Sequence, residues 1–561
     1  MKEKVRKALS EILISLGWEV DFDINEPPKE IKADLASPIP LLIAKKYNIA
    51  PYDSYNKIKE SCFKNFVKFL FEDIQFSPPG FLNFTLSKEI FFEELKQIIL
   101  QGKDYPKYES KNKKVLLEFV SANPTGPLHI GHGRCAVLGD VIGNILKKVG
   151  YSLKKEYYVN DRGRQINILV ASIISEIPER SINIDTNLKK WVEDIIKDSR
   201  YKGEYIKDIA QQLPNKFSEL TMDTLPELKK FVVEIIMQDI RTSLDNFNVK
   251  FDNYFYESSL YENGYDKIIK KFLEEKNLIE EKEGALWFKS EKFGDQKDRV
   301  IIKSDGEPTY FFSDIAYHYN KASRGFDWLI NIWGTDHHGY VERIKSACNS
   351  IFKSLNKDIK LDIILYQLVS LIKHGQKIAM STREGKFISL DEVVKEVGVD
   401  VTRFFLLTKT PDTHLEFDFD LAKEHSLKNP VYYIQYAHTR CCGILKEVSK
   451  TVDIDEVIKN IDSYINFLYE DKNYNEQEIE LIKKLCFYPD VLALCVDTMS
   501  GHHLCNYLIN VSKIFHKFYE KCRVIDRNGI VSYKRLLIVL STKIIISNSL
   551  EILGISIPEK M

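Results

Sequence analysis

The stretch VLLEFVSANPTGPLHIGHGRCAVLGDVIGNILKKVGY (residues 115–151) decides the fold class. Its first part, residues 115–120, is a short apolar run suited to a buried strand. A loop rich in Asn, Pro, Thr and Gly follows. Residues 133–151 then show helical apolar spacing, end in two lysines and stop at Gly150. A strand-like run at 155–159 completes a β-α-β unit, which predicts a parallel sheet covered by helices.

The rest of the chain divides into further folding units, because 561 residues exceed one compact core. Residues 1 to about 100 mix helical periodicity with short strand-like runs, and 101–114 is a polar linker. A second alternation of strand and helix occupies 299–350. From about residue 400 the strand signals fade and helical periodicity takes over. We therefore expect an all-helical C-terminal unit.

Composition narrows the class of protein. Lys+Arg (80) and Asp+Glu (81) nearly cancel, so any nucleic-acid surface must be a local patch. The nine cysteines are scattered without a C-x-x-C pair, which favours buried thiols in a reducing cytosol over disulfides or a zinc site. The start of the chain lacks the features of a signal peptide, and no window of about 18 uncharged apolar residues occurs. These features predict a cytoplasmic protein without a membrane span.

The loop of residues 121–133 carries the strongest chemical signal. It lies between the carboxyl end of a strand and the start of a helix, where free N–H groups and the helix dipole favour phosphate. Gly131 and Gly133 allow the backbone to approach a ligand closely. His129 and His132 lie on the same side of the first turn and can donate to phosphate oxygens. A surface turn with two incidental histidines, or a metal-binding pair, are the alternatives.

A second loop, KIAMSTREGK (residues 377–386), precedes the helical unit. Its cations and hydroxyl groups could neutralise a leaving pyrophosphate and shield the reaction from water. An ordinary solvated turn is the alternative.

Both loops resemble the adenylate-forming signatures of class I aminoacyl-tRNA synthetases. The first matches through His-Ile-Gly-His after Pro-Thr-Gly-Pro-Leu. The second departs from the family pattern Lys-Met-Ser-Lys-Ser, because Ala379 and Thr382 stand where lysines are usual. The departure leaves open which cation stabilises the triphosphate. The resemblance implies catalytic roles for His129, Gly131, His132, Lys377, Met380, Ser381 and Arg383.

Longer segments are similar to arginyl-tRNA synthetases in particular: residues 118–126, 156–161, 310–317, 333–340, 429–438 and 553–561. The resemblance implies a multidomain protein whose α/β Rossmann-type catalytic core, with a parallel sheet and insertions, spans 106–390. It places an N-terminal α+β additional domain at 1–105 and a stem or connector at 391–428. The C-terminal all-α anticodon-binding bundle then spans 429–561.

The resemblance also assigns the substrate pockets. A guanidinium group gains most from planar carboxylate acceptors in a partly dry pocket. The positions implied for the arginine side chain are Glu118, Tyr310 and Asp314, and those for its α-amino and carboxylate groups are Ser121, Asn123 and His129. The positions implied for ATP are His129, Gly131, His132, Asp336, His337 and Met380. From spacing alone, Asp314 could instead cap a helix beginning at Ile315, and His337 could be a core or surface histidine.

Aromatic and basic residues are interleaved at 432–440 and 513–523, a composition suited both to stacking on bases and to helix packing. The resemblance implies tRNA contacts at Tyr436 and Arg440, and at Phe81 and Asn83 in the N-terminal unit. It also implies that arginine activation depends on bound tRNA.

The function expected from the resemblance is that of an arginine–tRNA ligase. Such an enzyme activates L-arginine with ATP, releases pyrophosphate and transfers arginine to the 3′ end of tRNA(Arg). We expect ATP as a substrate with Mg²⁺ on its phosphates, no zinc, and a monomer. The alternatives are a class I synthetase for another amino acid, a non-catalytic tRNA-binding paralogue, which the altered loop suggests, and a small-molecule nucleotidyltransferase.

Overall fold

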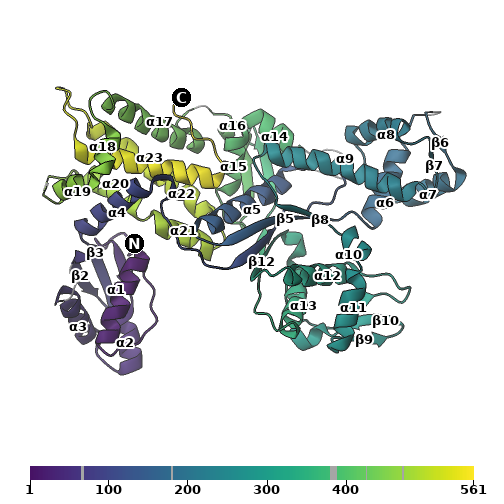
Figure 1. The fold of residues 1–561 in the computed structure, drawn as a ribbon, viewed down its shortest axis with the longest axis horizontal. Helices are drawn as coiled ribbons and strands as arrows, with labels where there is room; N and C mark the ends of the chain where they lie inside the picture. Colours follow the sequence, from purple (N-terminus) through teal and green to yellow (C-terminus); the bar gives the residue numbers. More distant parts are fainter. Residues whose placement is uncertain (65–68, 179–180, 379–387, 425, 471–472) are drawn as a thin grey trace.

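A five-stranded parallel sheet forms the centre of the molecule (Figure 1). The computed structural model describes residues 1–64, 69–178, 181–378, 388–424, 426–470 and 473–561. The strand order is β13-β12-β4-β5-β8, and every neighbouring pair is parallel. The strands are β4 (Lys114–Glu118), β5 (Ser152–Val159), β8 (Asn253–Tyr256), β12 (Trp328–Gly334) and β13 (Lys360–Tyr366). The predicted α/β core with a parallel sheet is confirmed.

Helix α5 (Ile130–Lys148) connects β4 to β5 and packs closely on the sheet. It begins three residues earlier than the apolar spacing predicts, because His129 acts as its N-cap. Glycines on its inner face allow the close approach. A Cβ atom at Gly139 would lie 2.2 Å from the Phe119 ring, and one at Gly143 would lie 2.7 Å from Cε of Lys155. The helix therefore holds the turn at its N-terminus against the sheet edge.

Two insertions interrupt the core on the right of Figure 1. The first, between β5 and β8, comprises α6 (Arg164–Ile174), α7 (Thr186–Ile196), α8 (Glu204–Lys216) and α9 (Leu225–Asn246), with the short pair β6 (Asn183–Ile184) and β7 (Glu219–Leu220). The second, between β8 and β12, comprises α10 (Ser258–Glu262), α11 (Tyr265–Glu275), an antiparallel sheet of β9 (Ile279–Lys282), β10 (Ala285–Phe288) and β11 (Arg299–Ile302), and α12 (Tyr310–Ser323). Helix α13 (Val341–Ser354) packs on α12.

The N-terminal unit combines helices with a small antiparallel sheet, as predicted. The sheet order is β1-β3-β2, with β1 (Leu35–Ser37), β2 (Phe71–Ser77) and β3 (Phe81–Leu86). Helices α1 (Lys2–Ser15), α2 (Ile39–Tyr47) and α3 (Pro51–Lys64) cover it. Helix α4 (Lys88–Gln101) leaves this unit and packs on the C-terminal helices.

The C-terminal unit is helical in its described part: α17 (Pro430–Val448), α18 (Ile454–Lys459), α19 (Ile461–Glu470), α20 (Glu476–Cys486), α21 (Tyr488–Asp497), α22 (His502–Lys521) and α23 (Tyr533–Leu553). Before it lie α14 (Leu390–Val397), α15 (Val399–Leu407) and α16 (Phe419–Ala422). The expectation that strands end near residue 400 is wrong at β16 (Leu415–Asp418), which pairs with β14 (Val369–Lys373) beside β15 (Gln376–Ile378). A four-residue strand is too short to leave a periodic signal.

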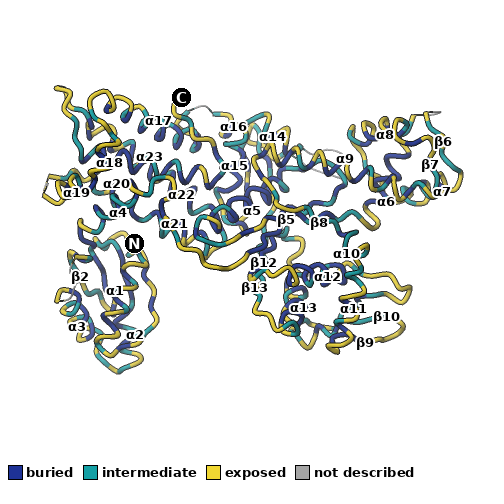
Figure 2. Tube along the Cα trace, viewed as in Figure 1, coloured by how far each residue is buried: buried dark blue, intermediate teal, exposed yellow. Residues whose placement is uncertain are grey.

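Helix α23 is long and apolar enough to cross a membrane, but 78% of its apolar window is buried inside the protein. Figure 2 shows burial along α23 and α5, which belong to the same hydrophobic core. The length and hydropathy of α23 are therefore those of a core helix.

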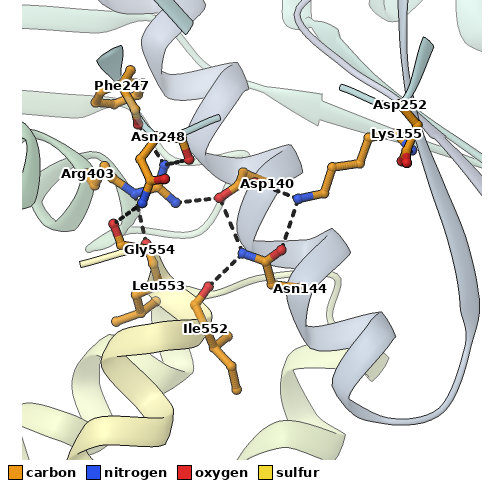
Figure 3. Close-up of polar contacts among 10 residues, drawn as sticks. All are labelled: Asp140, Asn144, Lys155, Phe247, Asn248, Asp252, Arg403, Ile552, Leu553 and Gly554. Atoms are coloured by element: carbon orange, nitrogen blue, oxygen red, sulfur yellow. Dashed lines mark hydrogen bonds and ion pairs between the residues drawn. The ribbon is translucent and has the colours of Figure 1, made fainter. Parts of the chain in front are cut away.

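A buried polar cluster joins α5 to the end of α23 (Figure 3). Asp140 of α5 accepts from Lys155 of β5 and from Arg403 of α15, each at 2.5 Å. Arg403 also donates to the carbonyl oxygens of Leu553 and Phe247, both at 2.9 Å. The cluster thus fixes α5 to the first insertion, to α15 and to the C-terminal helices.

Candidate active site

A cavity of about 610 Å³ opens at the carboxyl ends of β4, β5 and β12. This is the edge where open parallel sheets bind their ligands. Residues that the sequence assigned to arginine and to ATP line the same cavity: Glu118, Ser121, Asn123, His132, Tyr310, Asp314, Asp336 and His337. The fold therefore brings together residues as distant in the sequence as Glu118 and His337.

The two histidines of the 121–133 loop form a capping box at the start of α5, with His129 as the N-cap and His132 in the first turn. Nδ1 of His129 accepts from the backbone N–H groups of Gly131 (3.1 Å) and His132 (3.4 Å), while Nδ1 of His132 accepts from the backbone N–H of His129 (3.3 Å). The two rings stack with centroids 3.7 Å apart. Gly131 is required because a Cβ atom there would lie 2.9 Å from Cε1 of His129.

Both imidazoles are neutral at physiological pH. Burial lowers the pKa of His129, and burial together with the neighbouring His129 lowers the pKa of His132 further. Since Nδ1 accepts in each ring, the proton of each neutral ring lies on Nε2. Each histidine therefore keeps one N–H donor, and His132 lines the cavity. The predicted role of the two histidines as donors to phosphate oxygens fits this geometry.

Four carboxylate residues line the cavity: Glu118, Glu257, Asp314 and Asp336. Glu118, at the end of β4, is paired with the buried Lys321 of α12 and accepts from Oγ of Ser121 at 3.1 Å. Asp314 accepts from Oη of Tyr340 at 2.5 Å, and burial raises its pKa to about 7. Burial also raises the pKa of Glu257, which follows β8. Carboxylates held in a dry site without full neutralisation favour a cationic ligand.

Asp314 does not cap a helix, so that alternative is wrong. Helix α12 begins at Tyr310, and its N-cap is Thr309, whose hydroxyl accepts from the backbone N–H of Phe312. Asp314 lies in the second turn and faces the cavity with its carboxylate. The burial of this carboxylate is better explained by a ligand than by helix capping.

Ser121, Asn123 and Tyr310, which the sequence also assigned to arginine, lie at the cavity, whereas His129 is not among its lining residues. Ser121 has a φ of 41° and Val120 a φ of 65°, a strained backbone of the kind found at binding sites. The Ser121 hydroxyl accepts from the backbone N–H of Tyr158 at 3.1 Å. Asn123 donates to Oε1 of Gln165 at 2.7 Å, and Tyr310 is 63% exposed at the mouth. The 121–133 loop, strand β5 and helix α12 therefore meet at one cavity.

Sequence reasoning missed several lining residues. They include Tyr158 in β5, Asn160, Arg162 and Gln165 after β5, Glu257 after β8, Tyr340 after β12 and Tyr366 at the end of β13. The guanidinium carbon of Arg162 lies 3.7 Å from the centroid of the Tyr261 ring. Position at the carboxyl ends of neighbouring parallel strands was the available signal, since this edge lines the ligand crevice in such sheets.

Asp336 and His337 follow β12 and line the cavity, with carboxylate and imidazole 3.6 Å apart. The His337 side chain is 56% exposed, so the reading as a core histidine is wrong.

Lys377 lies on β15, where its Nζ pairs with Glu416 at 3.0 Å. The other positions assigned to this loop, Met380, Ser381 and Arg383, lie outside the described residues, as do Ala379, Thr382 and Lys386.

The residues assigned to tRNA contacts are placed differently in the two units. In the C-terminal unit, the guanidinium of Arg440 lies over the rings of Tyr436 (4.7 Å) and Tyr519 (5.1 Å). In the N-terminal unit, Phe81 is 38% exposed, but Asn83 is buried and donates to Oγ of Ser77 at 2.7 Å. Phe81 is therefore accessible, Arg440 is partly exposed, and Asn83 is accessible only if its surroundings rearrange.

Three family models match the chain in succession. The arginyl tRNA synthetase N-terminal domain matches residues 1–86, the class I (R) tRNA synthetase catalytic domain residues 94–418, and the DALR anticodon binding domain residues 434–561. The catalytic model alone covers more than half of the chain.

Curated relatives match over the full length. The arginine–tRNA ligase of Aquifex aeolicus is 38% identical, covering 100% of this chain and 99% of the relative. That of Carboxydothermus hydrogenoformans is 39% identical over 97% and 95%. The solved Thermus thermophilus arginyl-tRNA synthetase covers 100% of both chains with a TM-score of 0.76 at 19% identity, which supports the fold. The cavity, the His129–His132 turn and these matches agree, and the chain belongs to the arginyl-tRNA synthetase family.

Proposed function

We propose that the cavity forms arginyl-adenylate from L-arginine and ATP and then transfers arginine to tRNA(Arg), so that the chain acts as an arginine–tRNA ligase. The observation that carries the proposal is the meeting of the carboxylates of Glu118, Asp314 and Glu257 with the neutral imidazole of His132 in one cavity, beside the His129 cap of α5. The carboxylates fit the guanidinium group of arginine, and the imidazoles fit the phosphates of ATP.

Arginine lies in the part of the cavity between β4 and α12. Its guanidinium group meets Glu118 and Asp314, with the exposed ring of Tyr310 over it and Glu257 supplying further negative charge. Its α-amino and carboxylate groups meet Ser121 and Asn123 beside the His129 turn. Apolar amino acids would bring no cation to the buried carboxylates of Asp314 and Glu257, which disfavours a synthetase for another amino acid.

ATP lies over the N-terminus of α5. His129 and His132 donate Nε2–H to phosphate oxygens, Gly131 allows close approach of the backbone, and Asp336 with His337 contacts the adenosine. Lys377, Met380, Ser381 and Arg383 would complete the site from the second loop. Mg²⁺ enters with ATP, bound to its phosphates, and no zinc is required. No group of three potential metal ligands occurs among the residues that the structure describes.

Catalysis needs no general base. The arginine carboxylate attacks the α-phosphorus of ATP, the bond to the β-phosphate oxygen breaks, and pyrophosphate leaves. The terminal ribose hydroxyl of tRNA then attacks the carbonyl carbon of the adenylate, its proton passes to a phosphate oxygen of the adenylate, the acyl–phosphate bond breaks and AMP leaves. Positioning and donors aimed at the developing charge supply the rate enhancement. His129 and His132 provide such donors as neutral groups, because burial lowers the pKa of both. They therefore add no positive charge that would repel the guanidinium group of arginine.

The flanking units hold the tRNA. We assign the boundaries 1–105, 106–390, 391–428 and 429–561 to the N-terminal, catalytic, connecting and anticodon-binding domains. The Tyr436–Arg440 cluster contacts the anticodon region, while Phe81 and Asn83 contact the outer corner of the tRNA. The protein acts as a monomer in the cytoplasm, away from membranes.

A charging assay tests the proposal. The purified chain is incubated with ATP, Mg²⁺ and labelled arginine, with and without total tRNA, and pyrophosphate exchange and tRNA charging are followed. We expect charging with arginine alone, and exchange only when tRNA is present. Lysine, glutamine and cysteine are the controls. Binding of tRNA without charging would identify a non-catalytic paralogue, and charging with a control amino acid would overturn the pocket assignment.

The affinity for arginine should depend on pH through Asp314. Its pKa is about 7 in the ligand-free protein because of burial, and the guanidinium group binds the ionised form. At pH 6 only about a tenth of the carboxylate is ionised, so KM for arginine should be about tenfold higher than on the plateau above pH 8. Charging rates at saturating tRNA and ATP give KM at each pH. The Asp314→Asn variant should lose this dependence, and a parental KM that is constant from pH 6 to 8 would contradict the assignment.

A further inference from the structure

A buried chain of hydrogen bonds lies behind the cavity. Nζ of Lys321, on α12, contacts Oε2 of Glu118 and donates to Oδ1 of Asn331 on β12 at 2.9 Å. Nδ2 of Asn331 lies 2.9 Å from Nε2 of His318, whose Nδ1 lies 2.8 Å from the backbone carbonyl of Asp314. Lys321 and Asn331 are both 0% exposed and do not belong to the described lining of the cavity.

Every hydrogen bond in this series has its donor on the side nearer Lys321. The Asp314 carbonyl can only accept, so Nδ1 of His318 carries a proton. Burial lowers the pKa of His318 to about 3, so the ring is neutral and its Nε2 accepts from Asn331. The oxygen of Asn331 then faces Lys321. Lys321 is thereby connected to both carboxylate residues assigned to arginine, directly to Glu118 and through His318 to Asp314.

The buried ammonium group of Lys321 is fully satisfied. Besides Glu118 and Asn331, its Nζ lies 4.2 Å from the centroid of the Tyr317 ring. A buried ion pair is weak evidence for a role in stability, because apolar residues of similar volume often replace such pairs without loss. The charged ammonium group of Lys321, placed directly behind the substrate pocket, therefore favours a role in recognition of the substrate. The ammonium group of Lys321 pairs with Oε2 of Glu118, while Oε1 accepts from the hydroxyl of Ser121 at the cavity wall.

We infer that Lys321 is a positioning residue for arginine recognition: it fixes the orientation of Glu118, so that a planar guanidinium group finds two acceptors in a set geometry. The inference rests on the proposed function, since it assumes that Glu118 and Asp314 bind the arginine side chain. A forked guanidinium needs acceptors in fixed positions, whereas the compact ammonium of lysine does not. Loss of Lys321 should therefore weaken arginine binding and reduce discrimination against lysine.

The first test is the Lys321→Met variant, measured by charging at saturating tRNA and ATP. We expect KM for arginine to rise at least about tenfold while kcat changes less than about threefold, because the interaction acts on substrate binding. The Lys321→Arg variant, which keeps the charge, should recover much of the loss. Inhibition by lysine, relative to KM for arginine, should become stronger in Lys321→Met. The matched control is Lys357→Met, which removes a lysine that donates to the Ala322 carbonyl at the end of the same helix.

A double variant separates recognition from folding. Glu118→Gln with Lys321→Met removes both charges, so no unpaired buried charge remains and the thermal midpoint should be near that of the parent. KM for arginine should nevertheless stay raised at least about tenfold. A double variant with parental KM, or a Lys321→Met variant whose only defect is a lower thermal midpoint, would overturn the inference. If Asp314→Asn also leaves KM unchanged, the proposed pocket itself is wrong. If Asp314→Asn raises KM and Lys321→Met does not, only the role of Lys321 fails.

Discussion

Replacement of His132 by asparagine is expected to lower the rate of arginyl-adenylate formation by a factor of about 10²–10³, the usual effect of removing one donor to developing charge. The His132 imidazole lines the cavity, and its Nδ1 is already engaged by the backbone N–H of His129. Its Nε2–H is therefore the free donor. Since burial lowers its pKa, the imidazole donates as a neutral group throughout the physiological range.

The choice of asparagine separates catalysis from helix capping. Its side-chain oxygen can replace Nδ1 as the acceptor for the His129 N–H, so the N-cap of α5 and the thermal midpoint should change little. Glutamine instead places an amide N–H near the position of Nε2, and His132→Gln should retain more activity than His132→Asn. Single-turnover formation of the adenylate with saturating tRNA measures both. Equal losses in the two variants, accompanied by a lower thermal midpoint, would show that His132 acts only as a cap.

The core and the turn that we propose binds phosphate could be predicted from the sequence because their signals are local. The apolar run at 115–120, the loop and the helix ending before Gly150 fix a strand, a turn and a helix in order, and the parallel sheet follows. The glycines of α5 also show in the sequence, although their partners, such as Phe119 for Gly139, become clear only in the packed structure.

The electrostatics of the pocket could not be predicted. Glu118 and Lys321 are separated by 203 positions, and no periodicity connects them. Similarly, the prediction that Asp314 caps a helix is wrong because Thr309, five residues earlier, takes the N-cap position. Asp314 is instead buried at the cavity. The raised pKa of Asp314 depends on the removal of water by residues from several segments, which only the folded chain brings together.

The cluster shown in Figure 3 makes Asp140 a strong determinant of stability. Asp140 is 4% exposed and lies between Lys155 and Arg403, which are 5% and 0% exposed. Burial opposes ionisation of Asp140, but Arg403 and Lys155 together bring its pKa below the ordinary value. The carboxylate is therefore charged at neutral pH and balances two buried cations. Gly554 closes the cluster, since a Cβ atom there would lie 2.3 Å from Nη2 of Arg403.

Asp140→Asn keeps the shape of the side chain but leaves the ammonium of Lys155 and the guanidinium of Arg403 facing each other without an anion. Because an uncompensated buried charge costs about 3–5 kcal/mol, we expect the free energy of unfolding in urea to fall by about that amount.

Asp252→Asn is the matched control. That carboxylate also accepts from the backbone N–H of Lys155, but it is 31% exposed, so the loss should stay below about 1 kcal/mol. Adding Lys155→Met to Asp140→Asn removes one of the two unbalanced cations, so the double variant should lose less than the sum of the single losses. Additive losses, or a loss below about 1 kcal/mol for Asp140→Asn, would mean that packing of the helices holds α5 to the C-terminal unit without help from this charge. The expected outcome would instead assign that role to Asp140, at the middle of the helix whose N-terminus carries His129 and His132.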